Sequence, residues 1–73
     1  MSYENNLENP PDLRIGGVYR IRDGGKAIIT QRLRDHAGQE YWCGTIENAG
    51  ICTWTLEGKD RRGNEKWDLV AGY

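Results

Sequence analysis

Strand-forming residues alternate with polar residues in two neighbouring runs between Tyr41 and Leu56. The sequence Asn48-Ala49-Gly50 separates the two runs. A period of two predicts strands, and a three-residue loop that ends in a left-handed glycine predicts a hairpin. In the register that this loop sets, Gly44 lies opposite Trp54 and leaves room for its indole. We expect the rest of the chain to be organised around this hairpin.

The two faces of the predicted hairpin differ in polarity. The apolar face contains Trp42, Gly44, Ile46, Cys52, Trp54 and Leu56. The other face is mixed, as expected of a strand pair with one side in water, and contains Tyr41, Cys43, Thr45, Glu47, Ile51, Thr53 and Thr55. The two cysteines fall on opposite faces, so we expect no disulfide between them.

A second alternating pair precedes this hairpin, with strands predicted over Val18–Arg22 and Lys26–Arg34 and a turn at Asp23-Gly24-Gly25. A three-residue turn gives one apolar face, on which Gln31 is the only misfit: Tyr19, Ile21, Ala27, Ile29, Gln31 and Leu33. The opposite face then holds Val18, Arg20, Arg22, Lys26, Ile28, Thr30, Arg32 and Arg34. A two-residue turn would mix arginines with apolar residues on both faces, so we prefer the longer turn.

The remaining segments complete an all-β pattern. Residues 35–39 and 57–65 are polar and glycine-containing, which predicts loops, and Lys66–Val70 is a last short strand that returns Trp67 to the core. Five short strands in one small domain, residues 13–73, favour a five-stranded SH3-like barrel, with an OB-like barrel as the alternative. Residues 1–12 are rich in Asn and Glu and contain a Pro-Pro pair, which predicts a flexible acidic N-terminal arm.

Charge is unevenly distributed although the formal net charge is only −1. The first 12 residues contain three acidic groups and no basic ones, whereas residues 14–34 contain six basic groups and one acidic group. The predicted outward face of the first hairpin is the candidate binding site: Arg20, Arg22, Lys26, Arg32 and Arg34, with Tyr41 at its edge. Such a face would bind an anionic partner, or it would be an ordinary solvated face neutralised by acidic residues from elsewhere in the fold.

Candidate catalytic and metal-binding residues are sparse. His36, Cys43 and Cys52 lack the paired spacing of zinc ligands, so no metal site and no cofactor are expected. Cys43 could meet His36, but no oxyanion-forming turn accompanies them, and we do not expect an enzyme. The tryptophans could stack on nucleobases, yet they share a face with Ile46 and Leu56, which favours a place in the core.

The cellular location is also an expectation from the sequence. Unpaired thiols suggest a reducing compartment, and the chain shows neither the pattern of a signal peptide nor an apolar run long enough for a membrane span. We therefore expect a cytoplasmic protein without a membrane partner.

Several short patterns carry a resemblance to a group of small proteins encoded by bacteriophages and prophages. They are Leu13-x-x-Gly16-Gly17-x-Tyr19, Asp23-Gly24, Trp54-Thr55-x-x-Gly58 and Asp68-Leu69-Val70. The resemblance implies a compact β-barrel of phage or prophage origin and does not imply an activity. The acidic arm and the basic first hairpin depart from that group.

Three functional hypotheses follow. The first is a non-enzymatic binding module, a phage accessory protein that docks on a host protein or on a protein–nucleic-acid complex. The second is direct binding of nucleic acid through the basic face, with a strong salt dependence. The third is a homo-oligomer that sequesters an anionic small ligand between its copies.

Overall fold

The structure is a computed structural model that describes residues 12–73. Residues 1–11, most of the expected arm, lie outside the described residues. The chain forms five strands and one short 3-10 helix: β1 (Val18–Ile21), β2 (Lys26–Arg34), β3 (Glu40–Ile46), β4 (Gly50–Trp54), η1 (Glu65–Trp67) and β5 (Leu69–Gly72). The all-β prediction is confirmed.

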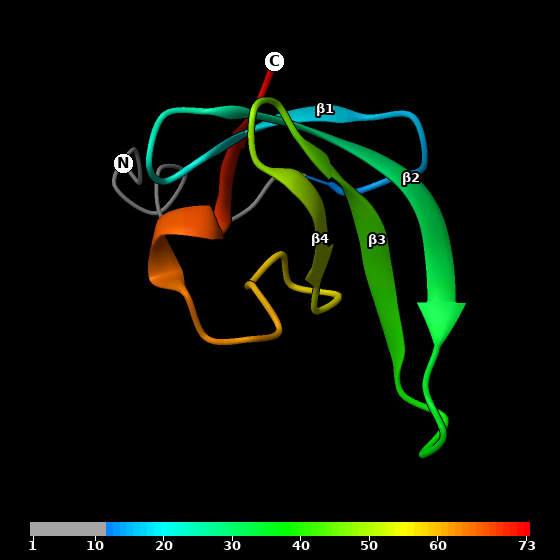
Figure 1. The fold of residues 1–73 in the computed structure, drawn as a ribbon. Coiled ribbons are helices and arrows are strands. Elements are labelled where there is room, and N and C mark those ends of the chain that lie inside the picture. The colour runs from blue at the N-terminus through cyan, green and yellow to red at the C-terminus, as the bar shows by residue number, and fades with distance from the viewer. Residues whose placement is uncertain (1–11) are drawn as a thin grey trace, which may run out of the picture.

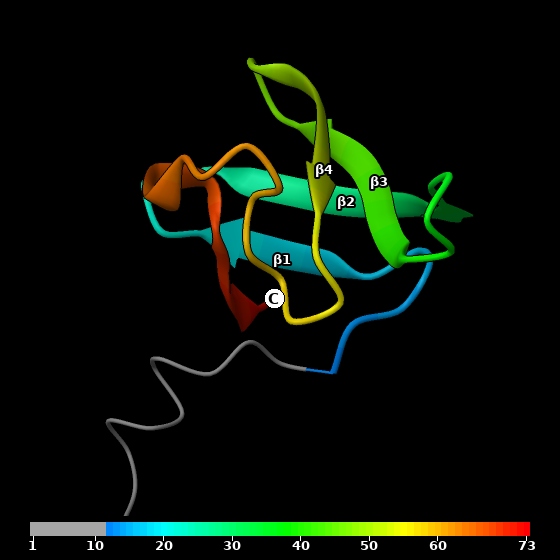
Figure 2. The ribbon, with the colours of Figure 1, turned by 90° about the horizontal axis from the view of Figure 1, so that it is seen from below.

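The five strands form a single antiparallel sheet in the order β4-β3-β2-β1-β5. The sheet is strongly curved and is not closed into a barrel, with β4 and β5 at its two edges. In Figure 1 the sheet bends around the segment of residues 55–68, which includes η1. Figure 2 shows the same curvature from below, with the β3–β4 hairpin turned out of the line of β1 and β2.

The core lies on the concave side of the sheet, which we call the inner face. It consists of Tyr19, Ile21, Ala27, Ile29, Trp42, Ile46, Cys52, Trp54 and Leu69, with Leu13 and Trp67 packed against it. Trp54 is the largest fully buried side chain. The convex side, the outer face, carries the alternate residues of each strand. The partition between faces that the sequence predicts for both hairpins is therefore correct for most positions.

The first hairpin differs from its predicted register by two residues. Tyr19 pairs with Ala27, so the loop has the three residues that we expected but begins one residue earlier, at Arg22. The reason lies in the backbone, because Gly24 takes the left-handed conformation, with φ +100°, and donates its N–H to the carbonyl oxygen of Ile21 at 2.9 Å. Since a shift of two preserves the period of a strand, the faces are unchanged.

The central hairpin shows the same kind of shift. Trp54 pairs with Trp42, and Gly44 pairs with Cys52. The prediction that Gly44 makes room for the indole of Trp54 is therefore wrong. A Cβ atom on Gly44 would lie 2.0 Å from the carbonyl oxygen of Ile28, so the glycine instead permits close approach of the β2 backbone.

A β-bulge in β2 is the largest departure from the predicted hairpins. Ile29 pairs with Gly44, but Gln31 pairs with Cys43, so Thr30 is an extra residue between the two pairs. An inserted residue reverses the side to which all later side chains of the strand point. Gln31 and Leu33 consequently leave the inner face, on which we had expected them.

Two further expectations for the core need correction. Leu56 lies beyond the end of β4, where it is exposed, instead of in the apolar face of the hairpin. The last strand starts at Leu69, later than expected, because Glu65–Trp67 forms η1, whose N-terminus is capped by the side chain of Asn64. Trp67 does return to the core, as a half-buried residue.

Candidate functional site

The five predicted cations do not share one face. Arg20 and Lys26 are cross-strand partners on the outer face, as expected. Arg32 pairs with the buried Trp42, and Arg34 pairs with Glu40, which places both arginines on the inner face beyond the bulge. The prediction of a continuous basic face is therefore wrong, and the bulge at Thr30 is its physical cause.

The arginines beyond the bulge are both paired within the chain. Both Arg32 and Arg34 form ion pairs with the carboxylate of Glu40, and Arg34 Nη2 lies 2.8 Å from Glu40 Oε2. Hydrogen bonds from Arg34 and then Arg32 lower the pKa of Glu40 from its ordinary value. Two cations thus share one anion, so the three groups together still carry one net positive charge, but both guanidinium groups are engaged within the chain.

The other two members of the predicted site lie apart from this pair. Arg22 belongs to the first loop, with Nη2 4.0 Å from Asp68 Oδ2. The ring of Tyr41 is covered by Arg61, whose guanidinium carbon is 3.8 Å from the ring centroid. Arg61 is in turn bound to Asp35, with 3.2 Å between Nη2 and Oδ2. The ring of Tyr41 is therefore already occupied by a cation of the same chain.

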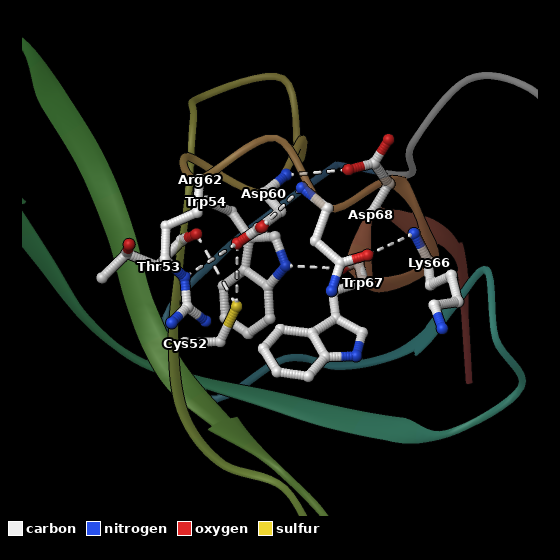
Figure 3. Close-up of polar contacts among 9 residues, drawn as sticks. Cys52, Thr53, Trp54, Asp60, Arg62, Lys66, Trp67 and Asp68 are labelled. Carbon is white, nitrogen blue, oxygen red and sulfur yellow. Dashed lines mark hydrogen bonds and ion pairs between the residues drawn. The ribbon is translucent and has the colours of Figure 1, made fainter.

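A buried polar cluster lies where β4 meets the loop that follows it (Figure 3). The thiol of Cys52 donates a hydrogen bond to Oδ1 of the buried Asp60 at 3.3 Å. Oδ2 of Asp60 accepts a hydrogen bond from the backbone N–H of Asn64 at 2.9 Å. The backbone N–H of Asp60 donates to Oδ1 of Asp68 at 2.8 Å. Each of these groups satisfies a buried partner, so the cluster fixes the path of residues 60–68.

This cluster stabilises the fold and does not provide a reactive thiol. Burial, followed by the hydrogen bond to Asp60, raises the pKa of Cys52 to about 12. A thiol with so high a pKa supplies almost no thiolate near neutral pH, and only the thiolate is a good nucleophile. Trp54 completes the cluster by donating from Nε1 to the carbonyl oxygen of Trp67 at 2.8 Å (Figure 3). The cluster therefore holds the loop and η1 against the sheet.

A row of side chains crosses the outer face at right angles to the strands. The cross-strand pairs Ile51–Thr45, Thr45–Ile28 and Ile28–Val18 connect β4 to β1, and Tyr73 continues the row by donating its N–H to the carbonyl oxygen of Val18. We call Ile51, Thr45, Ile28, Val18 and Tyr73 the outer row. Three of its members are large and exposed: Ile51 at 73%, Tyr73 at 65% and Ile28 at 39%.

The outer row borders a hollow of about 280 Å³ that is lined by Lys26, Ile28, Thr45 and Glu47. Its volume is just below the lower end for small-molecule pockets, roughly 300 Å³. Lys26 Nζ lies 5.7 Å from the centroid of the Tyr73 ring, and the guanidinium carbon of Arg20 lies 5.6 Å from the same centroid. Among residues 12–73 neither cation has a carboxylate within 4.0 Å, unlike Arg32 and Arg34.

The apolar part of this surface was not among the residues predicted from the sequence. Ile28, Ile51 and Tyr73 are the missed members, although Ile28 and Ile51 already occupied outward positions in the predicted hairpins. Large apolar side chains at outward positions of adjacent strands were the available signal. Only the pairing across the whole sheet, from β4 to β1 and on to Tyr73, shows that they form one row.

The described residues contain neither a metal-binding cluster nor a membrane-spanning helix. Within residues 12–73, no group of three or more His, Cys, Asp and Glu side chains is placed to hold a metal ion. In the same segment, no helix has the length and apolar character needed to cross a membrane. Searches against family models, curated proteins and solved structures gave no match to this chain.

Proposed function

We propose that the protein is a non-enzymatic binding module that docks on another macromolecule through the outer face of its sheet. The observation that carries this proposal is the outer row, in which the exposed side chains of Ile51, Ile28 and Tyr73 lie in one line across the sheet, with Thr45 and Val18 between them. Exposed apolar residues that occur singly need no explanation, but a contiguous set rimmed by polar residues is typical of an interaction surface.

The scaffold supports this role because the side opposite the outer row is rigidly packed. Ala27 and Ile29, which flank Ile28 in β2, are fully buried, and Gly44 next to Thr45 is packed against the β2 backbone. The outer side chains are therefore held by a backbone with little freedom to move. A preorganised surface loses less conformational entropy on binding than a mobile one.

We also propose that the fold is of the SH3-like kind. The first four strands form a meander, β5 returns to pair with β1, and a one-turn 3-10 helix directly precedes β5. An OB-like barrel has Greek-key connections, whereas β1 to β4 here are consecutive neighbours in the sheet. The phage or prophage origin and the cytoplasmic location belong to the same proposal, and they rest on the sequence resemblance and the free thiols.

Direct binding of nucleic acid through the basic residues is the weaker alternative. It required Arg20, Arg22, Lys26, Arg32 and Arg34 on one surface. The bulge separates them, and two of them are paired with Glu40. Only Arg20 and Lys26 remain beside an exposed aromatic ring, which is a small set for a backbone that carries one charge per nucleotide.

The proposed function is tested by affinity capture from a bacterial lysate, with and without nuclease. We expect the immobilised protein to retain a partner that the Ile51→Asp variant loses, and we expect nuclease to leave the capture unchanged. Arg34→Glu is the matched control because it also changes one exposed side chain, but on the inner face. Equal capture by the parent and by Ile51→Asp would show that the outer row is ordinary surface.

A further inference from the structure

The outer face is asymmetric in charge along the outer row. At the β4 end, Ile51 pairs with Thr45 and no cation lies in the row. At the opposite end, Arg20 and Lys26 both lie against the ring of Tyr73. The row therefore changes from an apolar end to a cationic end, and a complementary ligand must change from apolar to anionic in the same direction.

The dimensions of the row indicate the size of that ligand. Neighbouring strands in a sheet are about 4.8 Å apart, so the four steps from β4 to the residue that follows β5 span roughly 19 Å. An extended chain rises about 3.3 Å per residue, so roughly six residues cover this distance. The hollow beside Ile28 and Thr45 lies part of the way along, where one side chain of the ligand would enter.

We propose that the outer row binds an extended acidic segment of a partner protein, about six residues long. Apolar side chains of this segment contact Ile51 and enter the hollow beside Ile28, and its carboxylates meet Arg20 and Lys26. This inference rests on the proposed function and specifies the partner's chemistry. Carboxylates suit these two cations because neither has an anion within 4.0 Å among the described residues.

A nucleic acid fits the same surface less well. The apolar end of the row offers the branched side chain of Ile51 instead of a flat ring on which a base could stack. Glu47 also lines the hollow, where it would repel a phosphate. A protein segment that carries its acids only at the Tyr73 end avoids both conflicts.

The test is selection of binders from a random hexapeptide library on the immobilised full chain, followed by fluorescence anisotropy with the enriched peptides. We expect enrichment of peptides that combine Asp or Glu with large apolar residues. We expect their affinity to fall at least about tenfold in the double variant Arg20→Glu/Lys26→Glu, and by a similar factor in Ile51→Asp. Arg34→Glu should change the affinity less than about twofold, because it lies on the other face. Thermal melts verify that each variant is folded.

Several outcomes would overturn the inference. Enrichment of basic or purely apolar peptides would do so. Acidic peptides that bind both outer-face variants as tightly as they bind the parent would do so too. Absence of any enrichment over the double variant would also overturn it. A single-stranded oligothymidine that binds the parent and not the double variant would assign the surface to nucleic acid instead.

The lysate experiment separates this failure from failure of the proposed function. If a partner is still captured in a manner that depends on Ile51, but no acidic hexapeptide is selected, the outer row is a docking surface with a different ligand. If the capture does not depend on Ile51 either, the proposed function fails as well.

Discussion

The guanidinium of Arg32 lies over the indole of Trp42, with 5.0 Å between its central carbon and the ring centroid. Both side chains are on the inner face, and Trp42 is buried, whereas Arg32 is largely exposed. Trp42 Nε1 is a buried donor that has no hydrogen-bond partner among the described residues. Arg32 thus covers the end of the core, and its role is different from the surface role that the sequence predicted for it.

Trp54 should be the most sensitive position in the core. It is fully buried and donates a hydrogen bond to Trp67, so we expect Trp54→Ala to lower the free energy of unfolding by ~3–5 kcal/mol. A single core in a domain of this size supplies a net stability of only ~3–5 kcal/mol. Thermal melts followed by circular dichroism should therefore show a largely unfolded variant.

The matched control for Trp54→Ala is Ile51→Ala, which truncates an exposed side chain three positions earlier in the same strand. We expect it to change stability by less than ~0.5 kcal/mol. A Trp54→Ala variant that melts cooperatively within a few degrees of the parent would contradict the assignment of Trp54 to the core.

The faces of the central hairpin, and those of the first hairpin as far as the bulge, could be predicted from the sequence although neither register was correct. Alternation fixes which residues are buried, and an error of two residues leaves that pattern intact. The position of the turn could not be derived in the same way. Gly24 and Gly25 both tolerate a left-handed conformation, and the sequence alone does not show that Gly24 adopts it.

The bulge at Thr30 could not be placed from the pattern, although Gln31 was a sign of it. On a regular strand Gln31 is a polar residue on the apolar face, whereas after an inserted residue it points outward. The same insertion moves Arg32 and Arg34 to the inner face. One local irregularity therefore invalidated the predicted basic face while leaving the fold class correct.

Gly44 gives a test of the observed register against the predicted one. A Cβ atom at this position would lie 2.0 Å from the carbonyl oxygen of Ile28, so the two strands would have to move apart. We expect Gly44→Ala to cost ~1–3 kcal/mol of stability, as overpacking typically does. Urea denaturation measures this cost. An unchanged dependence of the unfolding free energy on urea concentration verifies that parent and variant both unfold in two states.

Gly25→Ala is the control for Gly44→Ala. Its added Cβ would lie 3.3 Å from Cδ1 of Ile21, the end of a flexible side chain that can adjust. The backbone of Gly25 is not left-handed, so alanine there should be neutral within ~0.5 kcal/mol. Equal losses at both glycines would indicate that close approach of β2 is not what requires Gly44.

The two cysteines should differ strongly in reactivity. Burial and the hydrogen bond to Asp60 raise the pKa of Cys52 to about 12, so only roughly 10⁻⁴ of this thiol is ionised at pH 8. Cys43 lies on the opposite face of the hairpin and is half-buried. With limiting iodoacetamide, we expect peptide mass spectrometry to find the label on Cys43 in the native protein.

Denaturation should remove this difference. In urea both thiols become accessible, and two labels per chain are expected under non-reducing conditions, because the two cysteines cannot form a disulfide across the hairpin. Comparable labelling of Cys52 and Cys43 in the native state would contradict the buried cluster around Asp60.

The stacking of Arg32 on Trp42 can be separated from its ion pair with Glu40 through their dependence on pH. Hydrogen bonds from Arg34 and Arg32 lower the pKa of Glu40 below its ordinary value of 4.5. A carboxylate with a lowered pKa in the folded state stabilises the protein above its unfolded pKa, and this contribution is lost as the pH falls through the folded pKa. The stacking does not depend on the charge of Glu40, so it should persist.

We therefore expect Arg32→Gln and Arg34→Gln to behave differently when each is compared with the parent from pH 7 to pH 3. Both variants should melt at a lower temperature than the parent at pH 7, because each loses a hydrogen-bonded partner of Glu40. As the pH falls through the folded-state pKa of Glu40 the deficit of Arg34→Gln should shrink, whereas Arg32→Gln should retain a loss of ~0.5–1 kcal/mol from the missing cation–π contact. Glu40→Gln should converge on the parent at low pH as Arg34→Gln does. If the deficit of Arg32→Gln shrinks as far as that of Arg34→Gln over this pH range, Arg32 acts only through Glu40, and its position over the indole adds nothing to stability.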